Sequence, residues 1–287
     1  LVNPHNPDSN YLNLNPSQIS WLNSQTKETR KEIMNYGFQN SGEVDFVSYC
    51  INYLIANPTT TFEQFQNWFM GTSEGIDGEY DAAYWENPSL TFPPQNLPTY
   101  DQYLQGMPRF ANGTFMIGAD NVYGLVGGDV QQKRLQYPAL TNNTCALKVS
   151  IALNRSGIII PNIPGKTFEG GGVEFTGKYF FLNAKSLNSW MRETFGTNPS
   201  TTSTPFNSNH ISYTGSQGGV NGINFPSLLS NVKGIFSMIT TETYINSGGA
   251  TGHADLIFPS NTNNLGTCIY GCNFNLPIER IDIWKLN

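Results

Sequence analysis

The first seventy residues carry apolar positions at helical spacing. Pro16 follows a capping asparagine, and a loose apolar stripe runs through residues 19–36 of an otherwise polar segment. A second apolar stripe covers residues 44–55, and residues 60–63 (Thr-Thr-Phe-Glu) fit a capping box for a third short helix. The pattern predicts a small helical module over residues 1–70, which docks or links and carries no catalytic constellation.

Residues 71–118 lose this periodicity and are rich in glycine, proline, tyrosine and asparagine. Prolines interrupt the segment at Pro88, Pro93, Pro94, Pro98 and Pro108. We expect an extended connector that packs on the following domain through aromatic side chains. These side chains are Tyr80, Tyr84, Trp85, Tyr100 and Tyr103.

From about residue 120 onward, helical and strand periods follow one another. Helices are predicted over residues 145–156 and 186–195, and strands over residues 234–244, 253–258 and 278–286. A helix that begins with a cysteine is thus followed, much later, by antiparallel strands that carry a histidine. The pattern predicts an α+β domain over residues 119–287.

Composition and charge narrow the functional classes. Only 13% of the 287 residues are charged, and small polar residues are abundant, a balance that suggests work outside a cytoplasm. The net charge of −6 argues against nucleic acid as a partner, because phosphate binding requires a basic surface. No apolar run reaches ~18 residues, so we expect no membrane-spanning helix. The chain shows no initiator methionine and no signal peptide, so we expect residues 1–118 to attach to a larger secreted protein or delivery machine.

Cys145 is the most informative of the four cysteines. It follows a run of capping residues, Thr-Asn-Asn-Thr, and should lie in the first turn of its helix. Unpaired backbone N–H groups and the helix dipole favour a thiolate there, which would make the sulfur a nucleophile. A small buried apolar role remains open, because free cysteines are often buried. Lys148, three residues later, either adds positive charge or is a solvated lysine.

His253 is the candidate base among the three histidines. It opens a strand after a glycine-rich turn, a position from which an imidazole could reach the helix start. His5 lies in the polar N-terminal tail, and His210 lies in the long polar loop predicted over residues 197–222, so we expect both to be solvated. The chain order, cysteine before histidine, is that of papain-like enzymes.

Five motifs together resemble one known family. They are the glycine pair at residues 126–130, the cysteine helix at 143–154, the Gly-His strand at 250–256, the cysteine pair at 268–272 and the closing strand at 281–284. In this order they resemble the fourth family of type VI secretion amidase effectors, papain-like enzymes related to the NlpC peptidases. The resemblance covers roughly residues 120–287. It implies a papain-like/NlpC-like fold in which the nucleophile helix packs on the antiparallel sheet.

The resemblance also implies a function, that of an antibacterial effector toxin. Members of the family cleave the γ-D-glutamyl–meso-diaminopimelate bond of peptidoglycan stem peptides, need no cofactor or metal, and are blocked by a cognate immunity protein. Cys145 would be the nucleophile and His253 the base, with the backbone N–H of Cys145 as one oxyanion donor. The protein would be secreted and would act in the periplasm or cell wall of a target bacterium.

The third catalytic group departs from the family pattern. The family often has an aspartate between the paired cysteines to orient the histidine, whereas here the three residues are Ile-Tyr-Gly. Asp255 could substitute, because it lies two residues after His253 and so on the same face of the strand. Asn261, Asn273 or a backbone carbonyl remain alternatives, and so does a structural role for Asp255.

Cys268 and Cys272 are expected to form a disulfide, which suits an oxidising compartment. Zinc is the competing interpretation, but it needs about four ligands and the neighbourhood offers two cysteines and an assigned histidine. Cys50 lies on an apolar helical face and is expected to be inert.

Two other functions remain open. The chain could be a wall-binding or structural module of a secreted assembly, in which Cys145 is catalytically silent. It could also be a papain-like protease or deamidase with a protein substrate, because this fold supports several reactions.

Overall fold

The structure is a computed structural model of the chain, and it describes residues 14–39, 46–56, 58, 62, 80–137, 141, 143–246 and 250–287. His5, most of the predicted capping box at 60–63 and residues 71–79 of the predicted connector lie outside the described residues. Within the described part, none of the helices combines the length and apolar character of a membrane span.

Three N-terminal helices form an apolar cluster of their own. They are α1 (Pro16–Ser24), α2 (Lys27–Gln39) and α3 (Phe46–Ala56). Asn15 and Gln18 cap α1 reciprocally, as the asparagine before Pro16 predicts. The buried members of the cluster are Leu22, Ile33, Val47, Cys50, Ile51, Leu54 and Phe62. The helices are therefore held together by their own apolar faces.

Residues 80–118 pack into the core of the larger body. They contain α5 (Ala82–Trp85) and α6 (Tyr100–Gly106), joined by proline-rich extended chain. Trp85 and Tyr103 are buried in the same cluster as Cys145 and Trp190. Gly106 lets α6 approach helix α9 (Cys145–Arg155) closely, because a Cβ at this position would lie 2.7 Å from the carbonyl oxygen of Ala152.

A second layer of short elements packs against another side of α9. It consists of α7 (Ala119–Val126), α8 (Gly128–Gln136), α10 (Gly172–Phe175) and the two-stranded sheet of β1 (Thr167–Glu169) and β2 (Tyr179–Phe181). Gly127 and Gly128 both have positive φ. A Cβ on Gly128 would lie 2.4 Å from the carbonyl carbon of Gly170. The glycine pair therefore permits close backbone packing against the segment before α10.

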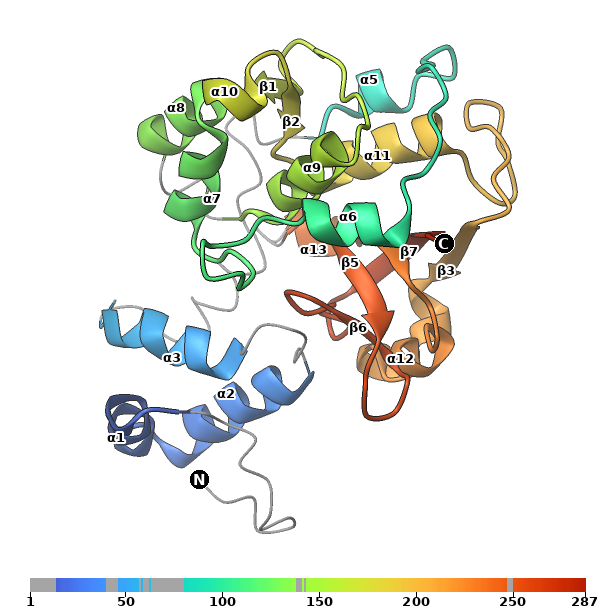
Figure 1. Cartoon of the computed structure of the whole chain (residues 1–287). Helices are drawn as coiled ribbons and strands as arrows, with labels where there is room; N and C mark the ends of the chain where they lie inside the picture. The colour runs from blue at the N-terminus through green and yellow to red at the C-terminus, as the bar shows by residue number, and fades with distance from the viewer. Residues whose placement is uncertain are drawn as a thin grey trace.

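A five-stranded antiparallel sheet in the order β3-β7-β4-β5-β6 forms the other half of the domain. Its strands are β3 (His210–Thr214), β4 (Gly234–Thr240), β5 (Gly252–Pro259), β6 (Gly266–Cys268) and β7 (Ile278–Lys285). Helices α9 (Cys145–Arg155) and α11 (Ala184–Phe195) pack on one side of the sheet, and α12 (Phe225–Leu228) packs on the other (Figure 1). The main core lies between these two long helices and the sheet.

Within residues 119–287, two segments differ from the sequence-based expectation. The predicted polar loop over residues 197–222 contains β3, which pairs with the last strand from His210↔Trp284 to Thr214↔Arg280. The predicted strand over residues 234–244 ends at Thr240, and α13 (Glu242–Asn246) follows it. The register between β4 and β7 shifts at that end, so the chain leaves the ladder there and forms a helix instead.

Candidate active site

Cys145 begins helix α9, as its capping run predicts. The backbone N–H of Cys145 donates to Asn143 Oδ1 at 2.9 Å, and the Lys148 N–H donates to the Thr144 carbonyl at 2.8 Å. The thiol thus lies at the positive end of the helix dipole. An oxyanion that uses the Cys145 N–H would have to displace the Asn143 amide oxygen, a competitor that the sequence did not indicate.

The remainder of α9 is buried on all sides, from Cys145 to Asn154. Two of its polar residues form hydrogen bonds with the neighbouring strand β2. Ser150 Oγ accepts the Phe181 N–H at 3.1 Å, and Asn154 Nδ2 donates to the Tyr179 carbonyl at 2.9 Å. Because these buried groups are hydrogen-bonded, the helix is held firmly in the interior and fixes the position of the thiol.

His253 is the second residue of β5 and pairs with Met238 of β4. Gly252 must be small, because a Cβ there would lie 2.2 Å from the Met238 carbonyl oxygen. The glycine before the histidine therefore allows close strand pairing, as expected from the sequence. Both Cys145 and His253 are only 7% exposed, and the thiol of Cys145 lies near enough to the imidazole to act on its pKa.

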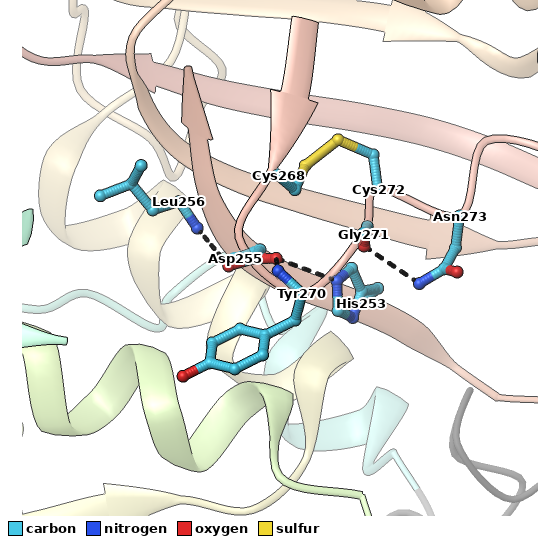
Figure 2. Close-up of a disulfide and its surroundings, with 8 residues drawn as sticks. All are labelled: His253, Asp255, Leu256, Cys268, Tyr270, Gly271, Cys272 and Asn273. Carbon is cyan, nitrogen blue, oxygen red and sulfur yellow. Dashed lines mark hydrogen bonds and ion pairs between the residues drawn. A yellow bond between two sulfur atoms is a disulfide. The ribbon is translucent and has the colours of Figure 1, made fainter. Parts of the chain in front are cut away.

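Asp255 lies beside His253 and is completely buried. Its Oδ2 is 3.7 Å from His253 Nε2. The carboxylate also accepts two backbone hydrogen bonds of 2.7 Å, from Leu256 N–H to Oδ1 and from Tyr270 N–H to Oδ2. Figure 2 shows the His253 imidazole and the Tyr270 backbone nitrogen both facing the carboxylate. These bonds hold Asp255 in place next to the imidazole.

The surroundings of His253 favour its protonated form. Burial alone lowers the pKa of an imidazole, but hydrogen bonds and negative charge from Asp255 and Cys145 raise the pKa of His253 to about 9. At neutral pH the site can therefore hold an imidazolium next to the sulfur, which is the partner that a thiolate requires.

A disulfide joins Cys268 and Cys272 close to this group of side chains (Figure 2). The loop that it closes contains Tyr270, whose backbone N–H binds Asp255, and Gly271, which has a φ of +92°. Asn273 Nδ2 donates to the Gly271 carbonyl at 3.1 Å. Although the loop lacks the aspartate of the family pattern, its backbone supports an aspartate from β5.

The other candidates from the sequence lie elsewhere or have other contacts. Asn261 is exposed. Cys50 is buried in the N-terminal cluster, and burial raises the pKa of its thiol, so it stays protonated. In the described part of the chain, no group of three or more His, Cys, Asp or Glu side chains is placed to hold a metal ion.

The expectation that His210 is solvated is wrong, because it is only 1% exposed. Its Nε2 contacts Asp282 Oδ1 at 2.9 Å, and its Nδ1 accepts the Asn198 N–H at 3.0 Å. Since Nδ1 is an acceptor, Nε2 carries the proton and donates it to Asp282. The alternation of Ile211 and Tyr213 with polar neighbours was the available signal for a strand.

Asp282 is the centre of a buried polar network that the sequence did not indicate. In addition to the histidine, Asp282 accepts hydrogen bonds from Arg192 (2.7 Å), Arg280 (2.7 Å) and Asn188 (3.0 Å). Burial alone would raise the pKa of Asp282, but the hydrogen bond from His210 and the charges of both arginines hold it well below its usual range. The network joins α11 to the sheet and is structural rather than part of the Cys145 site.

Comparison with known proteins identifies a family. A family model, Tae4, described as "Type VI secretion system (T6SS), amidase effector protein 4", matches residues 141–284, half of the chain. Similar solved structures include the Tae4–Tai4 complex from Salmonella Typhimurium, which is 18% identical, covers 67% of this chain and 100% of that chain, and has a TM-score of 0.47. Tae4 from Enterobacter cloacae is 17% identical, with coverages of 68% and 100% and a TM-score of 0.45. Among curated proteins, none matches the chain.

The fold is that of papain-like and NlpC-like cysteine hydrolases, with a helix that begins with cysteine packed on an antiparallel sheet. The chain belongs to the type VI secretion amidase effectors of family 4. It is therefore a secreted amidase effector that acts on peptidoglycan.

Proposed function

We propose that the chain hydrolyses the γ-D-glutamyl–meso-diaminopimelate bond of peptidoglycan stem peptides, with Cys145 as nucleophile, His253 as general acid and base, and Asp255 as the group that orients His253. The observation that carries the proposal is the buried arrangement of thiol, imidazole and carboxylate, with Asp255 Oδ2 at 3.7 Å from His253 Nε2. Since Nε2 faces the carboxylate, Nδ1 is the ring nitrogen left for the sulfur.

The reaction would proceed through an acyl-enzyme. The Cys145 thiolate attacks the amide carbonyl carbon, and the C–N bond breaks as the His253 imidazolium gives its proton to the leaving amine. The thioester is then attacked by water, whose proton returns to His253, and the products are a carboxylic acid and the free thiolate. The helix N-terminus favours negative charge at the carbonyl oxygen throughout.

The biological setting follows from the family and is likewise a proposal. Action in the periplasm or cell wall of a target bacterium suits the disulfide at Cys268 and Cys272. Several of the similar effector structures are complexes with Tai4 immunity proteins, which supports a cognate immunity partner for this chain. Delivery would use the type VI secretion machinery or a larger carrier polypeptide.

We also propose that residues 1–70 are a separate helical module, supported by their own apolar cluster. The described part of the connector, residues 80–118, contributes Trp85, Tyr103 and Met107 to the main core. A truncated protein that starts near residue 80 should therefore stay folded, whereas one that starts at residue 119 should be strongly destabilised in thermal melts.

Mass spectrometry of purified muropeptides tests the substrate directly. Wild type should split the stem after D-glutamate, and Cys145→Ala should not. Cys50→Ser is the matched control, because it removes a buried cysteine far from the site. Cleavage or deamidation of members of a protein panel, with muropeptides left intact, would favour a protease or a deamidase. No reaction by either wild type or Cys145→Ala would favour a binding module.

A further inference from the structure

Lys148 is a buried cation one helical turn after Cys145. The lysine is 5% exposed, so it is not the solvated residue that one interpretation of the sequence allowed. Its Nζ lies 3.5 Å from the centroid of the Tyr270 ring, a cation–π contact of short range. Tyr270 belongs to the disulfide loop that supports Asp255. The lysine thus joins the nucleophile helix to the loop behind the carboxylate.

The charges of the proposed site do not balance without this lysine. In the thiolate–imidazolium state, Cys145 carries a negative charge, His253 a positive charge and Asp255 a negative charge. All three residues are almost completely buried, and an uncompensated charge in such surroundings is unfavourable. The ammonium of Lys148 brings the net charge of the buried cluster to zero.

The groups around Lys148 allow it to keep the positive charge that this role requires. Burial lowers the pKa of Lys148 to about 8, and the negative charges of Asp255 and Cys145 oppose that effect. Tyr103 of α6 and Tyr270 also face this region, and burial raises the pKa of each well above its ordinary value, so both remain neutral. At neutral pH the lysine is therefore mostly protonated.

Two other cationic side chains lie near the site. His253, on β5, already pairs with the sulfur and with Asp255. Arg109 acts on Tyr270, but its guanidinium stacks on Phe115, 3.7 Å from the ring centroid. Lys148 is thus a second cation, besides His253, that interacts with both negative members of the site.

We propose that Lys148 is a positioning residue: its buried ammonium, held against the Tyr270 ring, stabilises the thiolate of Cys145 and the carboxylate of Asp255 together. This inference rests on the proposed function, because it assumes that Cys145 acts as a thiolate. It adds a fourth member to the site, one that acts through the others without contacting substrate.

Alkylation of Cys145 by iodoacetamide measures the thiolate without any wall substrate. The rate would be followed from roughly pH 5 to 10 without reductant, with the modified Cys145 peptide quantified by mass spectrometry. For Lys148→Met we expect the midpoint of the pH profile to rise by about one unit, which makes alkylation about tenfold slower below the midpoint. Lys148→Arg keeps the positive charge, so it should show the wild-type profile. Lys133→Met is the matched control, because Lys133 also contacts an aromatic ring, 5.0 Å from the Phe168 centroid, but on α8.

An unchanged profile in folded Lys148→Met, or an equal shift in Lys133→Met, would overturn the proposal. If circular dichroism shows that Lys148→Met does not fold, Lys148→Gln gives the same neutral change with a polar end, and an unchanged midpoint in that variant overturns the proposal equally. Failure of wild type to cleave muropeptides would count against the substrate alone, because the alkylation profile does not depend on the substrate.

Discussion

Replacing Asp282 by asparagine removes the negative charge that four hydrogen-bond donors share. Two of the donors are the guanidinium groups of Arg192 and Arg280, and the others are His210 and Asn188. The carboxylate is completely buried, whereas the side chains of Arg192 and Arg280 are 20% and 30% exposed. The asparagine would turn an N–H₂ group toward at least one of these donors.

The size of the effect follows from these contacts. Removal of one partner from a buried ion pair destabilises a protein by ~3–5 kcal/mol. Because both arginines can regain some water, we expect the lower end, about 3 kcal/mol. For a chain of this size each kcal/mol lowers Tm by about 2–4 °C, so Tm should fall by about 6–12 °C.

The assay is thermal and urea unfolding of wild type and Asp282→Asn, with Asp120→Asn as control. Asp120 also pairs with an arginine, at 2.7 Å, but its side chain is 85% exposed, so its loss should change stability by less than about 1 kcal/mol. Because the pKa of Asp282 is lowered in the folded state, its contribution is present above the unfolded value near 3.9 and is lost as the pH falls below it. The gap between wild type and Asp282→Asn should therefore narrow below about pH 4. Equal effects of the two substitutions at neutral pH would refute the buried network.

Three further predictions concern the site and its supports. Asp255→Asn should lower kcat on muropeptides by at least about tenfold, with a smaller change in KM, because the amide no longer stabilises the imidazolium of His253; unchanged kcat in steady-state assays would exclude the orienting role. Since the pKa of His253 is raised to about 9, its protonation stabilises the fold fully below pH 6.5 and this contribution is lost as the pH rises through about 9. The Tm difference between wild type and His253→Gln should shrink over that window, and a constant difference would contradict the raised pKa. Gly128→Ala should destabilise by about 2–4 kcal/mol, because φ is +57° and the new Cβ meets the Gly170 backbone at 2.4 Å. Gly113→Ala, with φ of +86° and no atom within 4 Å, should lose only about 1–2 kcal/mol in urea unfolding.

Local signals were sufficient for the helices and strands that carry the site. The capping run before Cys145 and the apolar spacing after it predict α9, and Asn183, which caps α11 through a 2.8 Å bond to the Ser186 N–H, begins a helix predicted from residue 186. The Gly-His strand and the closing strand were likewise predicted close to their observed bounds. Each of these elements has a periodicity or a cap that can be identified within about fifteen residues.

Partners that are distant in sequence explain what could not be predicted. His210 lies in a polar stretch, and its burial depends on Asp282, 72 positions later. Among the contacts that distinguish Asp255 from a surface carboxylate, the Tyr270 N–H is 15 positions away. Lys148 shows the same dependence, because only the fold places the Tyr270 ring against its ammonium. Polar contacts of this kind do not recur at a fixed spacing along the chain. The sequence alone therefore does not distinguish a paired, buried polar side chain from a solvated one.

The central claim is that Cys145 attacks the wall peptide and carries its acyl group. The direct measurement is peptide mapping by mass spectrometry after wild type is mixed with a purified muropeptide and quenched in acid within the first turnovers. We predict a thioester on the Cys145 peptide whose added mass equals the fragment that ends in D-glutamate, and no such adduct in Cys145→Ala. Muropeptide cleavage that persists in Cys145→Ala, or an adduct on another residue, would contradict the account.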